Sequence, residues 1–148
     1  MLIGKNGSMV PKEKALEFVS GLGVGIDFTR RDIQRKLRDK NQPWELSKAF
    51  EQSAPVGPFI SPEKISSSIL PLELDISLSV NGKIKQQANT RDMIFSVSEI
   101  ISDLSAFFTL LPGDLVFTGT PQGVGPVFPG DVLEARIDEL PCLSVAIQ

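Results

Sequence analysis

The 148-residue sequence contains no histidine and no tyrosine, and both absences restrict the chemistry that it can perform. Without histidine, a Ser-His-Asp triad, a Cys-His pair and any histidine-ligated metal site within these residues are excluded. A bound metal must then be a hard cation on oxygen ligands. Acid–base chemistry falls to aspartate, glutamate, lysine or water.

Cysteine, long apolar runs and excess charge are scarce as well. The single cysteine, Cys142, cannot form a disulfide within the chain, and we expect it to be a small buried apolar side chain. No stretch approaches the roughly 20 apolar residues of a membrane span, and no signal peptide is visible. The net charge is -3, with acidic and basic residues interspersed. We therefore expect a cytoplasmic protein that binds neither nucleic acid nor a membrane.

Length and composition predict a single domain. With 41% hydrophobic and 22% charged residues, the chain has the composition of a globular domain, and its length suits one hydrophobic core. No internal repeat and no linker divides residues 1–148. Strands outnumber helices without strict alternation, so the predicted class is α+β with mixed β-sheets. Strands are expected at residues 2–4, 22–28, 72–80, 83–90, 115–120, 132–137 and 143–148.

Helices are expected in three segments. Residues 11–21 begin with a proline suited to a first helical position, and residues 92–108 repeat apolar side chains at spacings of three and four. Thr29 and Asp32 match a capping box in front of a helix over 30–40. Asn81-Gly82 predicts a type I′ hairpin turn. A short element within residues 41–50 is expected to be anchored by Trp44, Leu46 and Phe50.

The stretch GVGIDFTRRDIQ places Asp27 where an apolar segment meets a helix start. A carboxylate there is consistent with a cap or surface salt bridge, with part of an anion site, or with one corner of a metal site. Arg31 and Gln34 are three residues apart on the first turn and share a face. They form either a solvated helix face or part of an anion site near the helix N-terminus.

Two further segments are candidates for ligand binding. Lys48 lies between apolar neighbours in LSKAF, where its ammonium either reaches solvent or holds a carboxylate or enolate in a pocket. The loop TGTPQGVGP, residues 118–126, is either a tight structural loop or an anion cradle, with Thr120 as its best donor. It lacks the GK[ST] of a phosphate-binding loop.

Together these segments resemble a known family. The sequence resembles the fumarylacetoacetate hydrolase superfamily over essentially all 148 residues, most closely its small branch of acylpyruvate hydrolases, oxaloacetate decarboxylases or tautomerases, and aromatic-degradation isomerases. The motifs that carry the resemblance are GIDFTRRDIQ, QPWELSKAF, P-x-G-P-F-I, VNGKIKQQANTRDMIFSVSEIIS and LLPGDLVFTGTPQGVGPVFPGD.

The resemblance implies a fold and a set of roles. It implies a roll or sandwich of mixed β-sheets with few helices, and a homodimer. Asp27 matches a ligand of Mg²⁺ or Mn²⁺, and Arg31, Gln34 and Lys48 match catalytic residues at the metal and substrate. Arg31 and Lys48 also match substrate-binding positions, as do Gly119 and Thr120, where the threonine holds a carboxylate. The implied substrates are small 2-oxo or β-diketo acids that react through an enolate.

The family pattern also includes residues that this sequence does not show. Family members carry a Glu-x-Glu pair before the motif that matches Ile3-Gly4-Lys5, and a lid segment with a catalytic histidine and glutamate. We therefore expect residues 1–148 to be a catalytic domain that lacks its N-terminal strand and lid, and to bind metal weakly and turn over poorly or not at all. The alternative is a catalytically inactive family member that serves as a binding or oligomerisation module.

Overall fold

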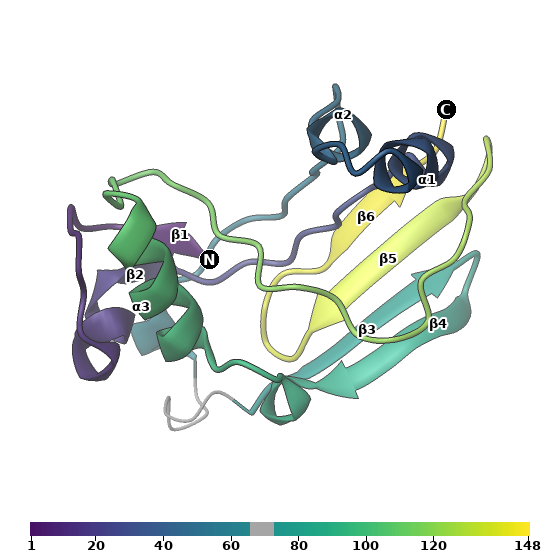
Figure 1. Cartoon of the computed structure of the whole chain (residues 1–148). Coiled ribbons are helices and arrows are strands. Elements are labelled where there is room, and N and C mark those ends of the chain that lie inside the picture. The colour runs from purple at the N-terminus through teal and green to yellow at the C-terminus, as the bar shows by residue number, and fades with distance from the viewer. Residues whose placement is uncertain (66–72) are drawn as a thin grey trace.

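The computed structural model describes residues 1–65 and 73–148 and has the α+β class predicted from the sequence (Figure 1). Leu72, expected in a strand, lies outside the described residues. The strands are β1 (Leu2–Ile3), β2 (Val19–Gly21), β3 (Asp75–Val80), β4 (Lys83–Asn89), β5 (Val132–Ile137) and β6 (Leu143–Ala146). The α-helices are α1 (Arg31–Asp39), α2 (Glu45–Lys48) and α3 (Val97–Phe107), and the 3₁₀ helices are η1 (Lys12–Phe18), η2 (Pro62–Lys64) and η3 (Thr90–Asp92).

A four-stranded antiparallel sheet in the order β4-β3-β5-β6 forms one side of the molecule. The β3–β4 hairpin turns at Asn81 and Gly82, whose φ angles of 51° and 75° confirm the predicted type I′ turn. The register shifts between Leu78 and Ser79, so that Leu78 faces Gln86 while Ser79 faces Ile84. Lys85 is therefore an extra residue in β4, the arrangement of a β-bulge.

The other side of the molecule contains β1, β2, η1 and α3 (Figure 1). Ala15 of η1 and Ile101 of α3 are both fully buried within its apolar cluster. A second apolar cluster includes Leu22, Leu74 and Ala135, of which Ala135 belongs to β5 of the sheet. The side chains of Met1 and Val19 pack against both clusters.

The predicted strand at residues 22–28 is wrong as a regular strand. The segment is extended and runs beside residues 53–60, but it forms only isolated bridges, such as Leu22 with Ile60 and Gly25 with Val56. Pro55 and Pro58 interrupt the partner segment, and proline has no N–H for a ladder hydrogen bond. The predicted strand at residues 115–120 is likewise not a regular strand, and its residues form one bridge, from Leu2 to Leu115.

Helix boundaries also differ from the sequence predictions. Residues 12–18 form a 3₁₀ helix, and residues 19–21 pair as β2 where a helix was expected. The α1 helix has Arg30 at its N-cap without a side-chain cap bond, so the predicted Thr29–Asp32 capping box is wrong. The α3 helix starts five residues later than expected, and Ile94, assigned to its buried stripe, is 91% exposed.

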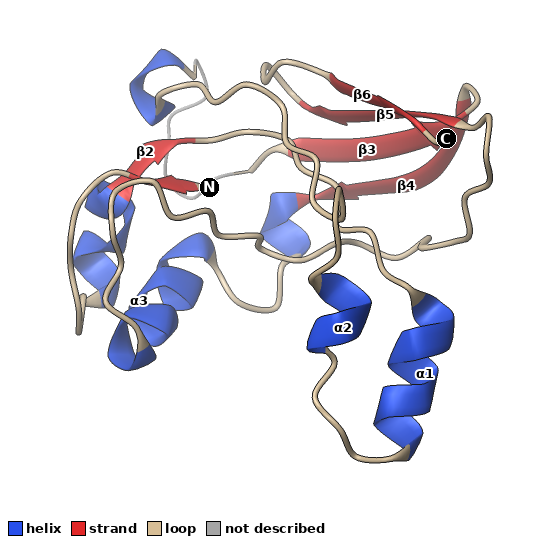
Figure 2. Ribbon diagram, turned by 90° about the horizontal axis from the view of Figure 1, so that it is seen from above, coloured by secondary structure: helices blue, strands red, loops and turns tan. Residues whose placement is uncertain are grey.

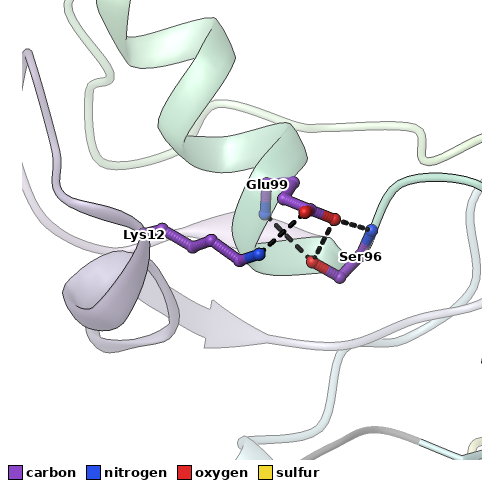
Figure 3. Close-up of polar contacts among 3 residues, drawn as sticks. All are labelled: Lys12, Ser96 and Glu99. Carbon is purple, nitrogen blue, oxygen red and sulfur yellow. Dashed lines mark hydrogen bonds and ion pairs between the residues drawn. The ribbon is translucent and has the colours of Figure 1, made fainter.

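A capping box at Ser96 and Glu99 fixes the start of α3 (Figure 3). The Glu99 N–H donates to Ser96 Oγ at 3.3 Å, and the Ser96 N–H donates to Glu99 Oε2 at 2.7 Å. Lys12 of η1 donates to Glu99 Oε1 at 2.7 Å. The hydrogen bond from Lys12, followed by those from Ser96, lowers the pKa of Glu99 from 4.5 to about 2.

Acid should remove the contribution of Glu99 to stability. Because the pKa of Glu99 is lower in the folded chain, its contribution is present above pH 4.5 and is lost as the pH falls toward about 2. We expect Glu99→Gln to lower the unfolding temperature at about pH 7 and to differ less from the wild type at about pH 3. Thermal unfolding of both proteins across this range measures the effect, and a constant difference would contradict it.

Three side chains are more exposed than the sequence suggested. Trp44 and Leu46, expected as anchors, are 50% and 67% exposed. They belong to the α1–α2 region, which projects away from the sheet and its core (Figure 2). Cys142 is exposed in the turn between β5 and β6, so the prediction of a buried thiol is wrong. No helix in residues 1–65 or 73–148 is long and apolar enough to cross a membrane.

Candidate functional site

Asp27 lies on the extended segment that leads from β2 to α1. The N–H groups on either side of it are held by neighbouring backbone, with Ile26 donating to Pro55 O at 3.0 Å and Phe28 donating to Ser53 O at 2.8 Å. These bonds fix the backbone around Asp27, whose side chain is 46% exposed. The carboxylate is therefore positioned by the chain but remains accessible.

Lys48 pairs directly with Asp27. Its Nζ lies 2.6 Å from Asp27 Oδ2, and its side chain is 38% exposed. Lys48 ends α2, and the preceding residue, Ser47, is fully buried and accepts a hydrogen bond from the Arg30 N–H at 3.0 Å. The Arg30 guanidinium also lies 4.4 Å from the centre of the Phe50 ring, a cation–π contact. Both contacts tie α2 to the segment that carries Asp27.

Arg31 and Gln34 share one face of the first turn of α1, as their spacing predicted. Arg31 Nη1 donates to Gln34 Oε1 at 2.9 Å. Arg31 is exposed and Gln34 is half-buried, and α1 has no buried residue. Nothing in the described residues joins this pair to Asp27 or Lys48 by a hydrogen bond or an ion pair.

Gly119 and Thr120 lie on the loop that follows residues 115–117. Gly119 has a φ of 102°, in the left-handed region that favours glycine. Thr120 is exposed, and its Oγ1 accepts a hydrogen bond at 2.9 Å from Gln86 Nε2 of β4. Gln86 is only 8% exposed. Gln86 lies within a motif that carries the family resemblance, but nothing in the sequence distinguishes it from the neighbouring Gln87 or assigns it a role.

The segment that leads to Asp27 and the loop that carries Gly119 both line a small cavity of about 80 Å³. Its lining includes Gly25, two residues before Asp27, together with Phe117 and Gly119. Gly25 and Phe117 are in close contact, since a Cβ on the glycine would lie 2.8 Å from the phenylalanine ring. No direct polar contact links Thr120 with Asp27 or Lys48 in the part of the chain that the structure describes.

The residues present do not form a metal site on their own. The described ranges 1–65 and 73–148 contain no group of three acids or cysteines close enough to hold an ion. Asp27 offers one carboxylate, and that carboxylate is paired with the ammonium of Lys48. Divalent cations such as Mg²⁺ usually need further carboxylates, waters or substrate oxygens. Asp27 can contribute one ligand, but the rest of the shell is not among these residues.

Comparison with known proteins assigns the family. The model of the fumarylacetoacetate (FAA) hydrolase C-terminal domain matches residues 1–148. The chain therefore belongs to the fumarylacetoacetate hydrolase family, as the sequence motifs predicted.

Relatives within the family carry different activities in their names. The chain is 44% identical to the mitochondrial oxaloacetate tautomerase FAHD1 of Mus musculus, covering 93% of this chain and 61% of the relative. It is 38% identical to a fumarylpyruvate hydrolase of a Ralstonia species, covering 99% of this chain and 74% of the relative. The chain thus spans about three-fifths of the mouse protein and three-quarters of the Ralstonia protein.

Solved structures confirm the fold. A fumarylpyruvate hydrolase from Pseudomonas aeruginosa, solved with Mn²⁺ and pyruvate, matches with a TM-score of 0.93 and 46% identity. The match covers 99% of this chain and 61% of that chain. The arrangement of strands and helices described above is therefore that of the family.

Proposed function

We propose that residues 1–148 form one domain that supplies part of the active site of an enzyme acting on small 2-oxo or β-diketo acids through an enolate. The observation that carries the proposal is the Asp27–Lys48 pair at 2.6 Å, in which Asp27 lies on the extended segment whose Gly25 lines the cavity beside Gly119. The reactions considered are C–C bond hydrolysis of acylpyruvates or fumarylacetoacetate-type acids, decarboxylation of oxaloacetate, and its tautomerisation. All of them develop negative charge on the former keto oxygen.

The protein groups have complementary roles in this proposal. Lys48 supplies a fixed positive charge toward the developing enolate, and Arg31 with Gln34 adds donors at the helix start. Thr120 and the backbone N–H of Gly119 bind the substrate carboxylate. Asp27 holds the Lys48 ammonium in place, because a 2.6 Å ion pair restrains an otherwise flexible side chain.

The proposal includes a divalent ion, Mg²⁺ or Mn²⁺, in addition to the protein groups named above. The Mn²⁺ and pyruvate in the Pseudomonas relative support a divalent metal. Asp27 would give that ion one ligand, and the remaining ligands would come from substrate, water or groups outside the described residues. A bound divalent ion supplies Lewis acidity toward a 2-oxo acid.

Turnover by the chain itself tests the proposal. Oxaloacetate and fumarylpyruvate are supplied separately with Mn²⁺, and their loss is followed by absorbance. Because Asp27 is the single protein ligand among the described residues, we expect only slow turnover of at least one acid, above the rate with Mn²⁺ alone, abolished by a chelator and restored by added Mn²⁺. A matched control is Asp39→Asn, because Asp39 lies at the far end of α1 from Arg31 and should not change the rate. No turnover of either acid at any Mn²⁺ concentration would contradict an active enzyme.

The alternative, an inactive module for binding or oligomerisation, is supported by the lone carboxylate at the site. It differs from the first proposal in a ligand-binding measurement. A ligand that binds only the folded chain raises the unfolding temperature. A shift caused by Mn²⁺ together with oxalate favours the active-site proposal, and no shift favours the module.

The expected homodimer and the cytoplasmic location stay predictions. Exposed apolar side chains support a partner surface at the α3 side of the molecule. They include Met9 at 74%, Phe107 at 76% and Phe108 at 65% exposure.

A further inference from the structure

The buried amide of Gln86 is a polar group that the roles above leave unused. Gln86 is the buried residue of β4, which is an edge strand of the four-stranded sheet. Burying an amide is unfavourable unless it is hydrogen-bonded. Gln86 Nε2 donates to Thr120 Oγ1 at 2.9 Å and to Pro121 O at 2.7 Å. The amide is therefore aimed at the loop that carries the proposed carboxylate-binding hydroxyl.

The contact with Pro121 fixes which end of the amide faces Thr120. A backbone carbonyl oxygen can only accept, so the group opposite Pro121 O must be the NH₂ of Gln86. The same nitrogen faces Thr120 Oγ1, and the hydroxyl is therefore the acceptor in that bond. A hydroxyl has one proton to donate. With Gln86 occupying an acceptor position, the proton of Thr120 is directed toward another group.

The backbone of β4 reinforces this geometry. The bulge at Lys85 directly precedes Gln86 and alters the alternation of side chains at that point. The loop approaches the same place, because a Cβ at Gly123 would overlap the Lys85 carbonyl oxygen. Gly123 also has a φ of 102°. The loop at residues 120–123 is thus held twice by β4: the side chain of Gln86 bonds Thr120 and Pro121, and the backbone of Lys85 packs against Gly123.

We propose that Gln86 is a positioning residue that makes the Thr120 hydroxyl a directed donor to the carboxylate of a 2-oxo acid. Gln86 does not touch the ligand and acts through Thr120. A hydroxyl that accepts a hydrogen bond becomes a stronger donor, so the chain from Gln86 through Thr120 to the carboxylate is cooperative. This inference rests on the proposed function, because it requires the site to bind a carboxylate.

Calorimetry with oxalate in the presence of Mn²⁺ tests the coupling between the two residues. Oxalate is used because it is a stable anion with the shape of a pyruvate enolate. We expect Thr120→Val to weaken binding about tenfold, the effect of losing one hydrogen bond to a charged group. Gln86→Met should weaken binding by a smaller factor, because the Thr120 hydroxyl remains but is no longer directed. The double variant should bind no more weakly than Thr120→Val alone, since Gln86 acts through the hydroxyl. Gln87→Met, at the exposed neighbouring position of β4, should bind as the wild type does.

Two outcomes separate this inference from the proposed function. If the wild type does not bind oxalate, the proposed function is overturned and this inference with it. If the wild type binds and Gln86→Met binds equally well, or if the two substitutions weaken binding additively, only the role of Gln86 is overturned.

An isosteric variant provides a second test, which remains valid even when Gln86→Met does not fold. Gln86→Glu places a carboxylate against Pro121 O and reverses the Thr120 bond, because a carboxylate can only accept. We expect its affinity relative to the wild type to be about tenfold lower at about pH 7 and to recover toward about pH 5, as the new carboxyl becomes protonated. A pH-independent ratio indicates a purely structural role and overturns the inference.

Discussion

Under the proposed function, replacing Lys48 with methionine should lower kcat/KM for a 2-oxo acid substrate by about 100-fold, the usual cost of removing one group that stabilises developing oxyanion charge. Methionine keeps much of the length of the side chain and removes its charge. The Asp27 carboxylate, which would lose the ammonium that lies 2.6 Å away in the wild type, would repel an anionic substrate. Steady-state kinetics with saturating Mn²⁺ measure the loss.

The matched control is Lys64→Met, which removes an exposed lysine from η2. This substitution changes the net charge by the same amount as Lys48→Met, but at a residue that is not part of the candidate site. Its kcat/KM should therefore equal that of the wild type. Lys48→Arg keeps the charge but changes the geometry of the donor, so an intermediate rate is expected. Equal rates for Lys48→Met and the wild type would remove Lys48 from the site.

Replacing Ile101 with alanine should have the largest effect on stability. Ile101 is completely buried in the cluster that joins α3 to η1 and β1. Deleting its apolar atoms removes buried contacts and leaves a cavity, which costs about 2 to 5 kcal/mol in the free energy of unfolding. Urea unfolding followed by circular dichroism measures the change.

Ile94→Ala is the paired control because it makes the same chemical change at a side chain that is 91% exposed. We expect its unfolding free energy to lie within about 0.5 kcal/mol of the wild type. A similar loss at both positions would mean that the buried cluster around α3 does not stabilise the chain in solution.

Local signals in the sequence predicted some elements well. The Asn81-Gly82 turn depends on two adjacent residues that favour positive φ, and it was found where expected. The helix α3 was predicted, but its start was not: Ser96 and Glu99 have the spacing of a capping box, whereas apolar periodicity extended the prediction to residue 92. Thr29 and Asp32 have a similar spacing without forming a box.

Tertiary context decided the elements that the sequence misassigned. Residues 22–28 look like a strand in isolation, but pairing depends on a partner that is interrupted by Pro55 and Pro58. Trp44 and Leu46 look like core anchors, but a helix of four residues that projects from the sheet has no core beside it. Propensity alone cannot supply this information.

The candidate residues could be named from the sequence, but the contacts between them could not be predicted from it. Asp27 and Lys48 were named from family motifs, and the 2.6 Å contact between residues 21 positions apart required the fold. The bond between Arg31 and Gln34 follows from helical spacing alone. Gln86 lies within a family motif but could not be assigned a role from the sequence, because its role depends on its burial and on a hydrogen bond to Thr120, 34 residues away.

The extra residue at Lys85 separates the length of the hairpin from the position of the Gln86 amide. A β-bulge accommodates one residue between two regular pairs, so Gln86 stays opposite Leu78 while Ile84 pairs with Ser79. The face on which the amide lies is therefore set by its pairing with β3, and not by the number of residues between it and the turn at Gly82.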